Sequence, residues 1–309
     1  MKRQRGASIA ELMVAAAVGL LVMLLAGELL VSANAAYVVQ VDAAAVDDSG
    51  RYALEIMTRA ARQAAFVNWE RGEAGADRAT APASIGGLDA RTLSRTTEGI
   101  DSPLADAVNG SDVLALRYGG AADGSVINCA GFAVDETDDG WSIFYVGRNA
   151  SGEAELRCKY RGKSSWGADA IIGGVDTFQV LYGLDTDSPA DGVANEYVSA
   201  AVLDERDAAL VLAAADPAAQ RRELRRRTHW KRIASIRVAL LVHGARRSQL
   251  DDAPMVFDLF GSAYSNVFGG GDPGVRLSER TLTDDLRRRE RRMFASAILL
   301  RNAPVEVVR

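Results

Sequence analysis

The feature that most constrains this chain is an apolar run near its N-terminus with a carboxylate at its start. Residues 12–27 are uncharged and mainly apolar, and residues 29–31 extend the run beyond Glu28. This length approaches the ~20 residues that a membrane-spanning helix needs. Basic side chains among residues 2–5 precede the run, and such flanks stay on the cytoplasmic side of a membrane. We therefore expect a membrane-entering helix with most of the chain outside the cytoplasm, and Glu11 is the charge that needs an explanation.

The helical pattern continues beyond the apolar run. Residues 37–66 lack proline. Apolar or small residues recur there at three- and four-residue steps, namely Val46, Gly50, Ala53, Leu54, Met57, Ala61, Ala64 and Ala65. This spacing predicts an amphipathic helix that lays one face on a globular domain. Residues 7–36 are then a transmembrane or assembly helix, and residues 37–66 are its amphipathic half.

An ordinary secretory signal is an alternative for the N-terminal segment. The basic start, the apolar centre and the sequence Ala33-Asn34-Ala35 fit a signal peptide with an A-x-A cleavage site. Glu11 would then interrupt an apolar region that also exceeds the usual ~7–15 residues. Under this alternative the protein is a secreted or anchored β-rich binding protein.

Residues 67–309 are predicted to form a globular, β-rich domain. Strands are indicated at 112–118, 177–182, 233–242 and 294–300, and a hairpin by 141–146 and 154–160 across a turn at 149–152. An Ala- and Leu-rich segment, 198–215, predicts a helix that lasts until Pro217. We expect an α+β fold in which the long helix packs on an antiparallel β-sheet.

Charge and cysteine content add two constraints. The formal net charge is only −5, so the chain as a whole does not have the composition of a nucleic-acid-binding protein. Its two cysteines, Cys129 and Cys158, lack the spacing of a metal site. In an exported domain they suit one disulfide, and two buried free thiols are the alternative.

Local signals of binding chemistry are weak. Asp185, Asp187 and Asp191 bring oxygen ligands to one turn, but their spacing departs from that of a calcium loop. A solvated acidic turn is therefore the preferred interpretation. Arginine-rich runs at 221–232 and 287–292 are expected to be solvated or paired with acidic turns. An anionic partner such as DNA is the sharper hypothesis for these runs.

Catalysis is poorly supported by the sequence. The chain has only two histidines, His229 and His243, and neither lies in a metal-ligand spacing. The G-x-S-x-G motif of a hydrolase nucleophile is also absent. We predict a non-enzymatic protein that needs no cofactor.

Two groups of residues carry a family resemblance. The sequence from Gly6 to Leu12, GASIAEL, resembles the class III leader of type IV pilins and type II secretion pseudopilins. Later pieces are similar to minor pilins of the PilW type, namely residues 48–54, 128–131, 144–146, 151–153, 156–158 and 174–185. The resemblance implies the pilin fold.

The leader resemblance also implies a processing step. Residues 1–6 would be removed by a prepilin peptidase after Gly6, and Ala7, where the family usually has Phe, would then be N-methylated. Glu11 would pair with the N-terminal amine of an adjacent pilin, which offsets the cost of a carboxylate in hydrocarbon. Alternatively, Glu11 lies near the lipid headgroups.

The implied function is that of a minor pilin in the assembly or priming of a type IV pilus. The implied partners are other minor pilins, the major pilin, the prepilin peptidase and the inner-membrane assembly platform. The protein would cross the inner membrane once, with a periplasmic domain, before it enters a pilus at the cell surface. A minor pseudopilin of a type II secretion system is the alternative among pilin-like proteins.

Overall fold

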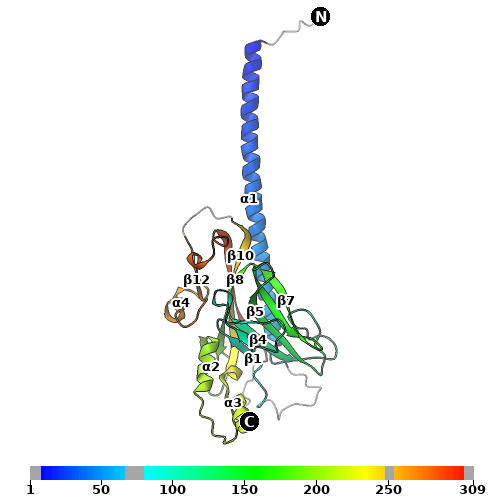
Figure 1. Cartoon of the computed structure of the whole chain (residues 1–309), viewed down its shortest axis with the longest axis vertical. Helices are drawn as coiled ribbons and strands as arrows, with labels where there is room; N and C mark the ends of the chain where they lie inside the picture. The colour runs from blue at the N-terminus through cyan, green and yellow to red at the C-terminus, as the bar shows by residue number, and fades with distance from the viewer. Residues whose placement is uncertain (1–7, 67–79, 248–253, 303–309) are drawn as a thin grey trace. The chain divides into compact units, whose positions relative to one another are not determined.

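The computed structural model describes residues 8–66, 80–247 and 254–302 of the chain (Figure 1). The chain divides into two compact units, residues 1–45 and residues 46–309. The long helix α1 (Ile9–Gln63) begins in the first unit and ends in the second.

Over residues 9–36, α1 is exposed and, apart from Glu11, Glu28 and a few polar residues, apolar. Its composition is dominated by Ala, Leu, Val and Met, and Ala, Leu and Met are strong helix formers. Every residue from 9 to 36 is exposed within the unit. By length and composition α1 is a candidate membrane span. A helix that is apolar all round needs lipid or other helices around it.

In the second unit, α1 buries one face, as its spacing predicts. The buried residues recur at three- and four-residue steps and are Val46, Gly50, Ala53, Ile56, Met57, Ala60 and Ala61. The helix ends at Gln63, and Ala65 takes a positive φ of 60° just beyond it. The backbone N–H of Ala65 then donates to the carbonyl of Arg117 at 3.0 Å, which fixes the chain's exit onto the sheet.

Two antiparallel sheets and four helices, α1 among them, make up most of the regular structure of the described residues. The first sheet has the order β1 (Ile85–Leu88), β4 (Val113–Gly119), β5 (Asp139–Arg148), β6 (Ala154–Arg161) and β7 (Trp166–Gly173). The second has the order β13 (Arg289–Leu299), β10 (Ile233–Arg247), β8 (Val175–Leu184) and β9 (Glu196–Val198). The other helices are α2 (Ala200–Ala208), α3 (Pro217–Arg227) and α4 (Ser262–Phe268).

Short elements complete the domain. Two small ribbons pair β2 (Thr92–Leu93) with β3 (Pro103–Leu104), and β11 (Val256–Asp258) with β12 (Arg276–Ser278). Short 3₁₀ turns lie at Val108–Gly110, His229–Arg232 and Glu279–Thr281.

One hydrophobic core joins the docked half of α1 to both sheets. Met57 of α1, Phe144 of the first sheet and Phe178 of the second all belong to it, and none of the three side chains is exposed. Every residue of β8 is buried, because this strand has protein on both faces. The predicted α+β arrangement of a long helix on antiparallel sheet is confirmed.

The strand predictions are confirmed and the helix prediction for residues 198–215 is wrong at its C-terminal end. Helix α2 stops at Ala208, and residues 210–216 are not helical. A new helix, α3, starts at Pro217, where Asp216 accepts the N–H groups of Ala218 and Ala219. Proline is favoured in the first turn of a helix because no hydrogen bond is lost there. Pro217 therefore begins a helix instead of ending one.

Gly50 permits a close contact between α1 and the second sheet. A Cβ atom at Gly50 would lie 2.3 Å from ring carbons of Phe294 on β13. We expect Gly50→Ala to lower the free energy of unfolding by ~1–3 kcal/mol through overpacking. This loss outweighs the ~0.5–1 kcal/mol that alanine usually gains over glycine in a helix. Urea denaturation of the full chain in detergent micelles would measure the change.

Gly173→Ala is the matched control, since a Cβ there meets nothing within 4 Å. We expect a change within ~0.5 kcal/mol at this position. Equal effects of the two substitutions would contradict the packing role of Gly50.

Candidate functional site

Glu11 forms a capping box at the start of α1. The backbone N–H of Ser8 donates to Glu11 Oε2 at 2.9 Å, and the N–H of Glu11 faces Ser8 Oγ at 3.4 Å. Such reciprocal bonds satisfy two of the N–H groups that a helix start leaves unpaired. The positive end of the helix dipole adds a favourable field for the carboxylate. The spacing of Ser8 and Glu11 in the sequence, S-x-x-E, is typical of this arrangement.

The capping box leaves one oxygen of Glu11 available. Among the described residues, only Oε2 of this carboxylate accepts a hydrogen bond. Oε1 can therefore accept a further donor while the capping box persists. Gly6 and Ala7, the predicted processing residues, lie outside the described residues. Glu28 is exposed on the apolar part of α1.

A disulfide joins Cys129 and Cys158, with the two Cα atoms 5.8 Å apart. Cys158 lies on β6, and Cys129 lies in the loop before β5. The backbone N–H of Cys129 also donates to Ser142 Oγ at 3.0 Å. The bond therefore ties a long loop to the middle of the first sheet.

The carboxylates of the acidic turn do come together. Oxygen atoms of Asp185, Asp187 and Asp191 lie within 4.8 Å of one another. Both oxygens of Asp185 accept backbone N–H groups, from Asp187 at 3.0 Å and Gly192 at 2.7 Å. Asp191 accepts the N–H of Val193 at 2.8 Å. These bonds shape the turn itself, which fits the preferred interpretation of an acidic turn.

The second arginine run is paired within the domain. Arg287 pairs with Asp284 at 2.8 Å, and Arg292 pairs with Asp47 of α1. Arg291 is fully buried, with Nε 2.7 Å from Asp176 and Nη1 2.8 Å from Glu279. Arg287 pairs within a turn, in line with the expectation, whereas Arg291 and Arg292 pair with carboxylates of β8 and α1 and so link distant elements of the domain.

His243 extends the ion pairs of Arg291 into a buried network. Its Nδ1 lies 3.0 Å from Asp176, and its Nε2 lies 2.9 Å from Glu153. Only 2% of the His243 side chain and 1% of the Asp176 side chain is exposed. The network links β8, β10 and β13 to the β5–β6 turn. It places His243 between carboxylates, where it cross-links strands.

His229 has a comparable structural position. Its Nδ1 lies 2.7 Å from Asp207 at the end of α2, and its backbone N–H donates to the same carboxylate at 2.8 Å. Both histidines thus bind acidic side chains of the domain.

The first arginine run forms an exposed face on α3. Glu223 accepts the N–H groups of Ala213 and Ala214, and Arg227 donates to the carbonyl of Val211, so this side of α3 holds the preceding loop. Four arginines lie on the other side of the helix by its 3.6-residue period. All four are exposed and have no carboxylate partner among the described residues; they are Arg221, Arg222, Arg225 and Arg226. We call these four residues the arginine face.

Lys159 is a buried cation without a carboxylate partner among the described residues. Its side chain is 0% exposed. Its Nζ donates to the carbonyl of Gly99 at 2.9 Å and to Thr97 Oγ1 at 3.2 Å, and it lies 5.6 Å from the ring centroid of Trp166. Burial lowers the pKa of Lys159 from 10.5 to about 8. This lysine holds the segment between β2 and β3 over the outer face of the first sheet.

The lowered pKa of Lys159 predicts a pH-dependent stability. Below pH 8 both the folded and the unfolded chain carry the proton, so the cost of burying the charge is constant. Between pH 8 and 10.5 the folded chain loses its proton first, and the free energy of unfolding rises with pH. We expect Lys159→Met to remove this rise, measured by urea denaturation at successive pH values.

Lys163→Met is the control, because the Lys163 side chain is 91% exposed. The difference between this variant and the wild type should not depend on pH in that window. A pH-independent difference for Lys159→Met would contradict the prediction.

Together, the exposed apolar helix with Glu11 at its start and the antiparallel sheets that dock its second half define a pilin-like α+β protein. A family model described as type IV pilus-assembly protein W matches residues 143–302, slightly more than half of the 309 residues. The chain belongs to this family, and it is therefore a pilin related to the type IV pilus.

The chain was also compared with solved structures and with curated proteins. The structure is similar to that of a type IV-like pilin from Thermus thermophilus, with 12% sequence identity and a TM-score of 0.38, over 83% of this chain and 97% of that chain. No curated protein matches the sequence.

Proposed function

We propose that this protein is a minor pilin that takes part in the assembly or priming of a type IV pilus. The observation that carries the proposal is the first part of α1, which is apolar all round, exposed over residues 9–36 and capped by Glu11. Such a helix can lie in lipid before assembly and among other pilin helices afterwards. The partners that this role requires are other minor pilins, the major pilin and the inner-membrane assembly platform.

The role also requires processing of the N-terminus. We propose that a prepilin peptidase cuts after Gly6, that Ala7 is then methylated, and that the domain faces the periplasm before assembly. The amine of Ala7 in one subunit would pair with Glu11 of the next; among the described residues only Oε2 of Glu11 accepts a hydrogen bond, which leaves Oε1 for this contact. Mass spectrometry of the mature N-terminus tests the step. N-methyl-Ala7 supports it, whereas a mature chain that begins at Ala36 supports the secreted alternative.

A deletion strain tests the assembly role itself. We expect loss of the gene to reduce surface pili strongly, and the tagged protein to capture other minor pilins from solubilised membranes. Normal piliation in the deletion strain would contradict a priming role. Intact pili together with a defect in type II secretion would favour the pseudopilin alternative.

The arginine face favours an additional anionic partner, and we propose DNA. Like charges four residues apart repel each other on a helix, so Arg221 with Arg225, and Arg222 with Arg226, are unfavourable pairs in the free protein. Arginine binds phosphate through two parallel hydrogen bonds. A phosphate backbone would therefore relieve this repulsion.

Salt titration of DNA binding gives this proposal a sharp test. If the arginine face makes four phosphate contacts, a plot of the logarithm of the DNA association constant against the logarithm of the salt concentration should have a slope of about −4. We expect the double variant Arg222→Ala, Arg226→Ala to reduce the slope by about 2, measured by fluorescence anisotropy with the full chain in micelles. Arg287→Ala is the control, because Arg287 belongs to the paired run. Binding that neither salt nor the double variant changes would contradict the proposal.

A further inference from the structure

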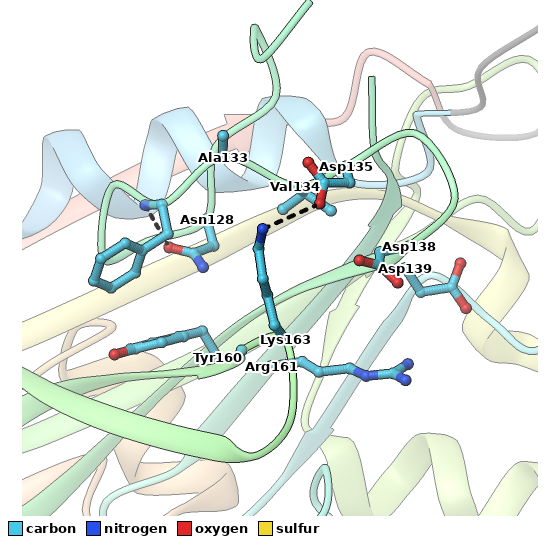
Figure 2. Close-up of a pocket in the computed structure, with 11 residues that line it drawn as sticks. Asn128, Ala133, Val134, Asp135, Asp138, Asp139, Tyr160, Arg161 and Lys163 are labelled. Carbon is cyan, nitrogen blue, oxygen red and sulfur yellow. Dashed lines mark hydrogen bonds and ion pairs between the residues drawn. The ribbon is translucent and has the colours of Figure 1, made fainter. Parts of the chain in front are cut away.

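A pocket opens between two segments that the disulfide holds together. It has a volume of about 440 Å³ and is lined by residues of the 128–139 loop and by residues 160–163 at the turn between β6 and β7 (Figure 2). Cys129 follows the lining residue Asn128, and Cys158 lies two residues before the lining residue Tyr160. The volume falls within the ~300–1,000 Å³ range of small-molecule sites. The covalent link makes the pocket a preformed one.

Asn128 presents a hydrogen-bond donor to this pocket from a buried position. The residue is only 3% exposed. Its Oδ1 accepts the backbone N–H groups of Ala130 at 3.0 Å and Phe132 at 3.1 Å, which fixes the orientation of the amide. Figure 2 shows the amide directed toward the space between Tyr160 and Lys163. Its Nδ2 can therefore donate to an acceptor in the pocket.

The apolar wall of the pocket is aromatic. Phe132 is 54% exposed although it is one of the large hydrophobic side chains. Its ring lies 5.2 Å from that of Tyr160, centroid to centroid, at an angle of 45°. The hydroxyl of Tyr160 donates to Asp169 at 2.9 Å, which holds this ring in place. The wall therefore offers a fixed apolar surface to a flat ligand face.

The rim of the pocket is polar and nearly neutral. Lys163 and Asp135 form a loose pair at 3.8 Å (Figure 2), and Asp139 pairs with Arg117 outside the pocket. Asp138 and Arg161 remain on the rim, and neither has an ion pair among the described residues. The aspartates of the rim would repel an anionic ligand, and its two basic side chains would repel a cationic ligand. The charges of the rim therefore favour a neutral ligand that carries several hydroxyl groups.

We propose that this pocket binds a neutral saccharide. The apolar C–H face of a sugar ring would lie on Phe132, its hydroxyls would bond Asp138 and Arg161, and one of its oxygens would accept an N–H of the Asn128 amide. An apolar ligand would leave the rim and the Asn128 amide without partners. The pocket gives the domain a binding activity that is separate from the assembly of its helix.

Saturation-transfer NMR tests the proposal with the full chain in a phosphocholine detergent, which contains no sugar. The probes are glucose, galactose, mannose and N-acetylglucosamine at millimolar concentration. We expect saturation transfer from the protein to at least one of these sugars. Phe132→Ala and Asn128→Asp should each weaken binding by at least tenfold. The aspartate keeps the oxygen that accepts the two loop N–H groups, so the loop should stay folded while the donor is lost.

Phe268→Ala is the matched control, because Phe268 is 52% exposed and lies on α4. It should leave saccharide binding within twofold of the wild type. Absence of transfer to all four sugars would overturn the proposal, and so would binding that the two pocket variants leave unchanged. A preference for a proline-rich or aromatic peptide over every sugar would overturn it in favour of a protein partner. Melting temperatures of all variants show whether each has folded.

Discussion

Replacing Arg291 by methionine is expected to lower the free energy of unfolding by about 3–5 kcal/mol. The guanidinium group is fully buried and ion-paired to Asp176 and Glu279, whose side chains are 1% and 6% exposed. Removal of the cation leaves Asp176 with His243 alone and deprives the buried Glu279 carboxylate of its ion pair with Arg291. A loss of this size is a large share of the ~5–15 kcal/mol that stabilises a typical domain.

Urea denaturation of the full chain in micelles measures this loss. Arg287→Met is the control, since the Arg287 and Asp284 side chains are 45% and 89% exposed and such surface pairs contribute ~0–1 kcal/mol. Adding Asp176→Asn to Arg291→Met should recover part of the stability, because it removes one of the two buried negative charges that Arg291 neutralises. If Arg291→Met and Arg287→Met lower the free energy of unfolding equally, the buried network of Arg291 does not stabilise the domain more than a surface ion pair does.

Reversing the charge at Glu11 is expected to remove the protein from pili. A charge in a membrane-embedded helix costs ~2.5–3.5 kcal/mol on insertion scales, and the proposed partner of Glu11 is a cation. Glu11→Lys would replace attraction by repulsion at that contact. The amount of protein in sheared pili should fall by roughly tenfold or more, since 1.4 kcal/mol is already a factor of ten, while the amount in the membrane stays similar.

Immunoblots of sheared pili and of membranes measure both quantities. Glu28→Lys is the control, because Glu28 is a second carboxylate on the exposed part of α1 and lies nearer the predicted outer interface. Glu11→Gln keeps the hydrogen-bonding capacity and removes the charge, so it should give an intermediate loss. Normal incorporation of Glu11→Lys would contradict the pairing.

Local patterns were sufficient to predict much of the fold. The three- and four-residue spacing of apolar and small residues located the buried face of α1, and two β-prone runs on either side of a Gly-containing turn located the β5–β6 hairpin. Each of these signals lies within one element or between neighbouring elements. The disulfide followed from two cysteines in a domain expected outside the cytoplasm.

Contacts between distant parts of the sequence could not be predicted in this way. Arg291 meets Asp176 across 115 residues, and Lys159 meets Gly99 across 60. In both cases the sequence showed a charged residue and gave no sign of its burial. The pocket also depends on such a pairing, because its walls come from segments that only the sheet and the disulfide bring together. The capping box of Glu11 was different, since its spacing was visible in the sequence.

The contact of α1 with β13 has a consequence for the order in which the domain can fold. Gly50 meets the ring of Phe294, and Asp47 meets Arg292 across 245 residues. Helix α1 precedes β13 in the chain, so this part of its buried face is covered only after β13 has been synthesised. Contacts of such long sequence separation slow folding. Four of the seven buried residues on this face are Gly or Ala, namely Gly50, Ala53, Ala60 and Ala61. Their small side chains limit the apolar surface that is exposed before β13 is available, and with it the opportunity for aggregation.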